Sequence, residues 1–184
     1  MSKIEITWLG HSSFKIKIGN QMLLLDPWLK DNPLFPTEKL EATLSDINYI
    51  LISHAHADHS SEAISYSKTC EAPIVGIYDY VSFIEKTNKV NVIGFNRGGT
   101  LKLGNVNITM VSASHSSSFY SNNNFYYGGN EAGYMIENNG RTIYFSGDTD
   151  VMADMEFFEE IHKPEIGILC AGGHFTMGME RAAY

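Results

Sequence analysis

Short runs of alternating hydrophobic and polar residues open the chain. Residues 4–8 read I-E-I-T-W, and residues 14–18 alternate apolar side chains with two lysines. A third apolar run, residues 22–25, follows the turn residues Gly19 and Asn20. Alternation with a period of two is typical of strands, and short links favour antiparallel neighbours. The pattern therefore predicts three strands in an antiparallel meander.

The middle of the chain changes to alternating strands and helices. Residues 49–52, Y-I-L-I, form a continuous apolar run of the kind found in a buried central strand. Ser60 or Ser61 is the expected N-cap of the helix that follows. The expected elements are helices over residues 60–69 and 80–86 and strands over residues 73–77 and 90–93.

Strand patterns return in the last third. The expected elements are strands over residues 101–103, 106–111, 132–137, 142–145 and 166–169 and a helix over residues 155–161. Asn139 and Gly140 form a strong hairpin signal between two of these strands. This order predicts a layered α/β fold with large mixed sheets. A chain of 184 residues suits a single domain over residues 1–184 with one core.

Residues 112–130 fit neither pattern. The segment is rich in serine and asparagine and carries five aromatic residues. Flexible linkers lack such aromatic side chains, so we interpret the segment as a loop that faces a substrate, and a plain surface loop is the alternative.

The composition limits the classes of molecule that the protein is expected to bind. The formal net charge is −8, from 13 Lys and Arg against 21 Asp and Glu, without a basic cluster. This argues against an extended nucleic-acid surface and favours a small-molecule substrate. No apolar run is long enough for a membrane span, and no secretory signal is visible. Two cysteines are too few for a disulfide framework, so we expect a cytoplasmic protein and leave homo-oligomerisation open.

Three histidines and an aspartate crowd the turn after residues 49–52. His54, His56, Asp58 and His59 lie within six residues. Isolated histidines are mostly structural or exposed, but such a cluster is favourable when it binds metal. His54 and His56 lie two apart and point to one side of an extended backbone, whereas Asp58 and His59 lie beyond them. The spacing predicts two metal ions.

The motif H-A-H-A-D-H resembles H-x-H-x-D-H of the metallo-β-lactamase superfamily. That resemblance implies an αββα sandwich with the metals at one edge. His115 in V-S-A-S-H-S and Asp148 in F-S-G-D match two later ligands of the family. The resemblance implies one ion held by His54, His56 and His115, a second held by Asp58 and His59, and Asp148 between them.

Further motifs narrow the resemblance. Four motifs are similar to those of one branch of the superfamily, the uncharacterised metal-dependent hydrolases near the L-ascorbate-6-phosphate lactonases. They are W-L-G-H-S-S-F, D-P-W, G-G-N-E-A-G-Y and G-G-H-F-T-M-G. The implied reaction is attack by a hydroxide, held between two divalent ions, on an ester, lactone or phosphoester of a small metabolite. Zinc or manganese suits these ligands best, and iron is also compatible.

Three residues are candidates for roles beyond metal binding. Asp58 is expected to orient the hydroxide or accept its proton. His174 lies in a motif similar to G-H-S-T of tRNA 3′-processing endonucleases, where the histidine serves the leaving oxygen; a structural histidine in a glycine turn is the alternative. His11 is expected to line the mouth of the site and bind substrate, or to be structural.

The end of the chain departs from the family pattern, which has one further histidine ligand after another helix and strand. This chain stops in G-M-E-R-A-A-Y, where residues 180–184 predict the first turn of a helix. We expect the C-terminal part to be truncated and the second ion to lack its last protein ligand. A naturally short form is the alternative.

Other functions fit the same motifs. A phosphodiesterase or nuclease is suggested by the segment around His174, but the net charge of −8 counts against it. An iron-dependent redox enzyme is compatible with the ligands. A non-catalytic binding protein agrees least with the nearly complete ligand set.

Overall fold

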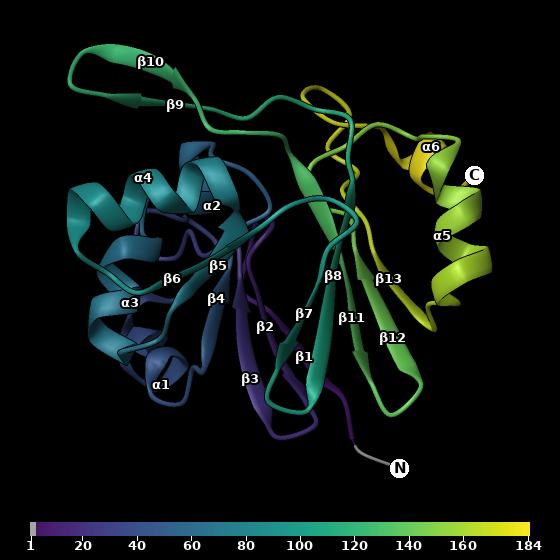
Figure 1. The fold of residues 1–184 in the computed structure, drawn as a ribbon, viewed down its shortest axis with the longest axis horizontal. Helices are drawn as coiled ribbons and strands as arrows, with labels where there is room; N and C mark the ends of the chain where they lie inside the picture. The colour runs from purple at the N-terminus through teal and green to yellow at the C-terminus, as the bar shows by residue number, and fades with distance from the viewer. Residues whose placement is uncertain (1–2) are drawn as a thin grey trace.

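The computed structural model describes residues 3–184 and shows two mixed β-sheets packed face to face between two layers of helices (Figure 1). Helices α1 to α4 cover the outer side of one sheet, and α5 and α6 lie on the outer side of the other. This arrangement confirms the predicted αββα sandwich with two mixed sheets.

The first sheet has the strand order β1-β2-β3-β4-β5-β6. Its strands are β1 (Glu5–Trp8), β2 (Phe14–Ile18), β3 (Gln21–Leu25), β4 (Tyr49–Leu51), β5 (Ile74–Ile77) and β6 (Val92–Phe95). The first three strands pair antiparallel, which confirms the meander. Strands β3 to β6 are parallel, so β4 lies in the middle of the sheet as its apolar run predicted.

The second sheet has the order β13-β12-β11-β8-β7. Its strands are β7 (Thr100–Leu103), β8 (Val106–Ser112), β11 (Ala132–Asn138), β12 (Arg141–Phe145) and β13 (Ile166–Ile168). Asn139 and Gly140 join β11 to β12 with φ of +53° and +77°, the left-handed pair typical of a tight hairpin turn. The predicted hairpin is confirmed.

The helices are short. They are the 3₁₀ turn η1 (Thr37–Lys39), α1 (Leu40–Leu44), α2 (Ala57–Ser60), α3 (Ala63–Cys70), α4 (Tyr78–Asn88), α5 (Asp154–His162) and α6 (Met179–Ala182). The 3₁₀ turn and α1 were not predicted. Within residues 3–184, no helix has the length and apolar character needed to cross a bilayer.

The helix predicted over residues 60–69 was wrong at its start. Residues 57–60 form the separate turn α2, and α3 begins at Ala63 after Glu62, which makes no side-chain cap. The Ser60 hydroxyl does not cap α3, because it donates to the Ala55 carbonyl (3.0 Å) and pairs with the Tyr80 hydroxyl (2.8 Å). These bonds brace the turn that carries the histidine cluster.

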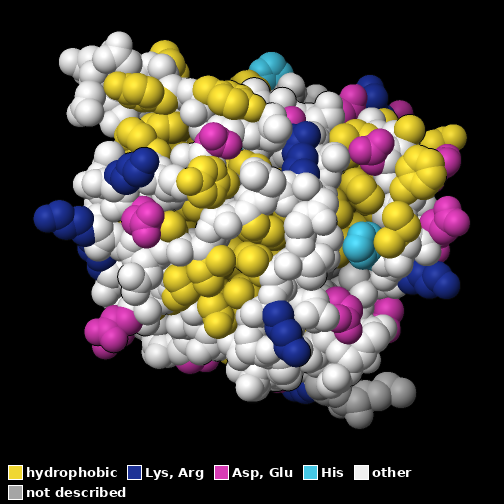
Figure 2. Space-filling model, in the orientation of Figure 1, with side chains coloured by type: hydrophobic (Ala, Val, Ile, Leu, Met, Phe, Trp, Pro, Cys, Tyr) yellow, Lys and Arg dark blue, Asp and Glu magenta, His cyan; other side chains and the backbone are white. Residues whose placement is uncertain are grey.

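The segment expected as a loop over residues 112–130 contains a β-hairpin. Strands β9 (Ser118–Ser121) and β10 (Asn124–Tyr127) pair antiparallel, with Asn122 and Asn123 both at positive φ in the turn. The hairpin projects from the body above α4 (Figure 1). Hydrophobic side chains lie along this projection (Figure 2), and Phe125 is 77% exposed.

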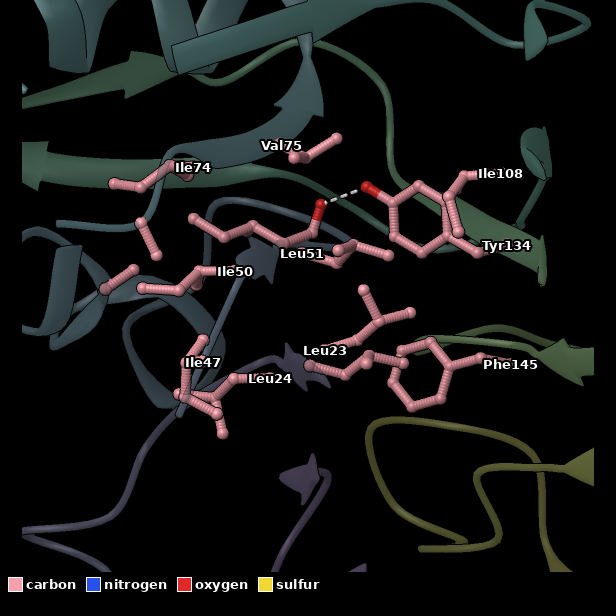
Figure 3. Close-up of a cluster of buried hydrophobic side chains, with 14 of the residues drawn as sticks. Leu23, Leu24, Ile47, Ile50, Leu51, Ile74, Val75, Ile108, Tyr134 and Phe145 are labelled. Atoms are coloured by element: carbon pink, nitrogen blue, oxygen red, sulfur yellow. Dashed lines mark hydrogen bonds between the residues drawn. The ribbon is translucent and has the colours of Figure 1, made fainter. Parts of the chain in front are cut away.

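The core fills the space between the two sheets. Leu23 and Leu51 of the first sheet face Tyr134 and Phe145 of the second (Figure 3). The buried Tyr134 hydroxyl donates to the carbonyl of Ile52, the residue after β4. This bond anchors the end of β4, directly before the histidine turn, to the opposite sheet.

Candidate metal centre

The histidine turn starts where the central parallel strand β4 ends, at the edge of the sheet where polar side chains can meet. Two hydrogen bonds hold this turn. The Ser53 carbonyl accepts from the amide of Ala132, the first residue of β11 (3.0 Å), and the Ala55 amide donates to Ser117 Oγ in the loop between β8 and β9 (3.1 Å). The histidine cluster is therefore bonded to the second sheet and to the loop that follows β8.

The first donor group consists of His54, His56 and His115. Their ligand nitrogens all lie within 4.8 Å of one another, and His54 Nε2 is 2.9 Å from His56 Nδ1. Ligands bound at about 2.1 Å to one ion lie roughly 3.0–3.4 Å apart, so these nitrogens are spaced as ligands of one ion. Burial, reinforced by His59 and His56, lowers the pKa of His54 well below its usual value. His54 is therefore neutral, as a ligand must be.

The second donor group is formed by Asp58, His59 and Asp148. His59 Nε2 lies 3.4 Å from Asp148 Oδ2 and 3.8 Å from Asp58 Oδ2. The same Asp148 oxygen lies 3.8 Å from His115 Nε2, so Asp148 stands between the two groups. His59 Nε2 is buried and has no hydrogen-bond partner among the described residues. An orphaned buried nitrogen between carboxylates fits a divalent cation.

Electrostatics around His59 favour a positive charge. Burial alone would lower its pKa, but the carboxylates of Asp26 and Asp148 outweigh this effect and raise the pKa to about 10. Burial also opposes ionisation of Asp148, yet His59 and His115 hold its pKa below the usual value. The protein without metal therefore keeps a proton where a cation would bind.

Asp26 was missed as a site residue. Its Oδ2 lies 2.8 Å from His59 Nδ1 and accepts from Ser53 Oγ (2.5 Å), which in turn lies 3.0 Å from His54 Nδ1. One buried carboxylate thus orients a histidine of each donor group. The available signal was a charged residue directly after the apolar strand β3, at the same sheet edge as the histidine turn.

Gly147 brings the Asp148 turn against the histidine turn. Its φ is +59°, and an added Cβ would lie 2.6 Å from the Ala132 carbonyl oxygen and 2.8 Å from Ser53 Cβ. Only glycine allows this approach. The Asp150 amide donates to the Ser114 carbonyl (3.1 Å), which joins the Asp148 turn to the loop of His115.

Glu131 and Arg97 fix the backbone of His115. The His115 amide donates to Glu131 Oε1 (3.2 Å), and the Arg97 guanidinium lies 3.2 Å from the same oxygen. This pair was not predicted, because both residues are distant from His115 along the chain and only the fold brings them to its backbone.

Comparisons with known proteins identify the family of the chain. A family profile described as "Beta-lactamase superfamily domain" matches residues 5–184. A UPF0173 metal-dependent hydrolase of Dinoroseobacter shibae is 55% identical over 181 residues, which cover 98% of this chain and 79% of that protein. The chain belongs to the UPF0173 metal-dependent hydrolases of the metallo-β-lactamase superfamily.

Other members of this family are similar over the same length. The UPF0173 metal-dependent hydrolase of Paracoccus denitrificans is 48% identical over 181 residues, with the same coverage of 98% and 79%. Among solved structures, the metallo hydrolase Igni18 of Ignicoccus hospitalis matches with a TM-score of 0.82 and 29% identity, covering 97% of this chain and 75% of that one. The chain therefore has the αββα fold and belongs to a family whose members are named metal-dependent hydrolases.

One cavity opens directly onto the donor groups of this UPF0173 hydrolase. It has a volume of about 730 Å³ and is lined by His56, Asp58, His115 and Asp148. His174, which is exposed in the loop before α6, lines the same cavity. His11 also lines this cavity. Because its Nε2 lies 3.0 Å from Asp58 Oδ2, the side chain lies beside the second donor group as well as in the cavity wall.

A second cavity lies under the β9–β10 hairpin. Its volume is about 840 Å³, and its aromatic wall includes Tyr80, Phe83 and Phe119. His56 and Asp58 line this cavity too, so both cavities meet at the histidine turn. The segment expected to face a substrate therefore forms one wall of a space that reaches the candidate metal centre.

Proposed function

We propose that this UPF0173 hydrolase holds two divalent cations and hydrolyses an ester, lactone or phosphoester of a small metabolite. The observation that carries the proposal is the position of Asp148 Oδ2, which lies 3.8 Å from His115 Nε2 and 3.4 Å from His59 Nε2. A carboxylate between two donor groups is the arrangement expected of a ligand shared by two ions.

The donors suit particular metals. Neutral imidazoles and carboxylates favour zinc or manganese and also accept iron. When bound, a pair of such ions supplies a hydroxide nucleophile at neutral pH and polarises the attacked carbonyl or phosphoryl oxygen.

Asp58 is the candidate to orient the nucleophile or to accept a proton from it. A hydrogen bond from His11 outweighs partial burial and lowers the pKa of Asp58 to about 2, so the side chain is ionised at neutral pH. The carboxyl group is 45% exposed and lines both cavities, which places it at the boundary between donor groups and substrate space.

His174 is the candidate to protonate the leaving oxygen. It lines the 730 Å³ cavity and belongs to neither donor group, which supports a role beside the substrate. Histidine gives up a proton readily near neutral pH, which this task requires. The His174 ring lies 4.4 Å from the ring of Phe175, between ring centres, in edge-to-face contact.

The cavity agrees with a small substrate. A volume of about 730 Å³ is in the range of small-molecule sites. The net charge of −8 does not favour a polyanion such as RNA. The family resemblance suggests a lactone of a phosphorylated sugar acid as the substrate class. We also propose that the reaction takes place in the cytoplasm.

Metal analysis combined with a substrate panel tests this proposal. We expect two equivalents of zinc or manganese per chain and turnover of a lactone, aryl ester or phosphate ester. Turnover should vanish after chelation and return when metal is added. Bound iron with oxidation but no hydrolysis would contradict the proposal, as would a single equivalent of metal. Faster cleavage of bis-nitrophenyl phosphate than of every lactone and ester would favour a phosphodiesterase.

A further inference from the structure

We propose that His11 is a metal ligand, binding through Nε2 the ion that Asp58, His59 and Asp148 hold, instead of contacting substrate. The inference deepens the proposed function and rests on its two-ion site. It replaces the role in substrate binding expected from the sequence with one in the metal centre itself.

The distances support a shared ion. His11 Nε2 lies 3.0 Å from Asp58 Oδ2, and ligand atoms of His11, Asp58 and His59 all lie within 4.8 Å of one another. Two ligands bound at about 2.1 Å to one ion lie roughly 3.0 Å apart at right angles and roughly 3.4 Å apart at tetrahedral angles. The pair formed by His11 and Asp58 matches the first spacing, and the unpartnered Nε2 of His59 completes the group.

The backbone conformation at His11 is fixed by its turn, and this restricts the direction of the side chain. His11 has a φ of +48°, a left-handed conformation that is uncommon for residues other than glycine. The turn around it is closed by bonds from the Leu9 amide to the Ser13 carbonyl (2.9 Å) and from the Ser13 amide to the Gly10 carbonyl (3.0 Å). Trp8 Nε1 donates to the His11 carbonyl (2.8 Å). Strained residues held in this way cluster at functional sites.

The imidazole ring is also positioned from its sides. Its centre lies 5.2 Å from the Trp28 ring and 5.4 Å from the His59 ring, both in edge-to-face contact. Trp28 follows Asp26, which orients His59, so one short segment supports both rings. Ligands that are oriented before the metal arrives bind it more tightly.

A hydrogen-bonding role is the competing explanation. His11 could orient Asp58 through the 3.0 Å contact without binding metal. Two substitutions separate these roles. His11→Asn tolerates the left-handed backbone but lacks an imidazole, and His11→Gln keeps a side-chain N–H that can reach a neighbouring carboxylate. His162→Asn, at the end of α5, is the matched control.

The experiment titrates the metal-free proteins with manganese(II), using calorimetry, metal analysis and the electron paramagnetic resonance signal of coupled manganese pairs. Wild type and His162→Asn should bind two ions and show the pair signal. Both His11 variants should keep one tight site and lose the pair signal at stoichiometric metal. They should bind the second ion at least about tenfold more weakly, because loss of a residue that only supports a ligand already lowers metal affinity by about that factor. Melting curves check that each variant is folded.

The outcomes separate this inference from the proposed function. Two ions bound by wild type and by both His11 variants with equal affinity would overturn the inference alone. Loss of the second ion in His11→Asn but not in His11→Gln would also overturn it, because a hydrogen bond to Asp58 would then suffice. Only one ion in wild type would overturn the two-ion function together with the inference.

Discussion

Asp26 Oδ2 lies 2.8 Å from His59 Nδ1, and neither side chain reaches solvent. The bond occupies one ring nitrogen and leaves Nε2 directed toward Asp58 and Asp148. The other oxygen of Asp26 accepts from the Ser53 amide (2.7 Å), so the carboxylate joins the start of the histidine turn to its end.

Asp26→Asn should weaken metal binding without removing a ligand. The amide keeps the size of the side chain but loses the charge that orients His59 and increases its basicity. We expect the affinity for the second ion to fall by about 10–100-fold, measured by competition with a chelator. Asp46→Asn, which removes a surface partner of Lys15, is the control. Equal affinities of Asp26→Asn and wild type would contradict the orienting role.

Asp148→Ala should lose metal and activity together, because the substitution removes the group between the two donor sets. We also expect His56→Ala to lose both. Metal content and turnover are measured on the same preparation. Asp150→Asn is the control, since Asp150 pairs with Arg181 at the surface. Full metal content and turnover in Asp148→Ala would show that the assignment is wrong.

His174→Gln should slow turnover while two ions stay bound. General acid catalysis contributes about 10²–10⁴-fold, and the loss should be largest for alkyl esters and small for nitrophenyl esters, whose leaving group needs no proton. The measurement compares kcat for the two substrate types and the metal content of both proteins. An equal loss on both substrates would indicate a structural role for His174.

Glu62 should contribute stability that depends on pH. It accepts hydrogen bonds from the amides of Leu29 (2.7 Å), Lys30 (2.9 Å) and Asp31 (3.0 Å). Burial would raise its pKa, but the Tyr66 hydroxyl and these amides outweigh burial and lower it. A carboxyl group with a lowered pKa stabilises the fold above its unfolded pKa, and this contribution is lost as the pH falls through the folded pKa.

Thermal unfolding of Glu62→Gln tests that prediction. The variant should melt below wild type at neutral pH. The difference should start to shrink as the pH falls below the ordinary glutamate pKa of about 4.3, and it should be lost as the pH falls through the lower pKa of Glu62 in the folded protein. Glu41→Gln, an exposed substitution on α1, should follow wild type throughout. A difference between Glu62→Gln and wild type that does not change with pH would contradict the role of the charge.

The sequence predicted local features of the fold well and tertiary features poorly. The meander, the central strand β4 and the hairpin at Asn139 and Gly140 depend on short-range patterns, and all were confirmed. The role of Asp26 was missed because it depends on strands β3 and β4 lying side by side. The β9–β10 hairpin was missed because Asn122 and Asn123 were interpreted as loop composition instead of a turn between aromatic strands.

The donor groups come from both halves of the sandwich. His54, His56, Asp58 and His59 follow a strand of the first sheet, whereas His115 and Asp148 follow strands of the second. Ions shared by these residues would act as a removable cross-link between the two sheets. Because a ligand that binds only the folded state stabilises it, the resistance of the protein to unfolding would then depend on the concentration of free metal.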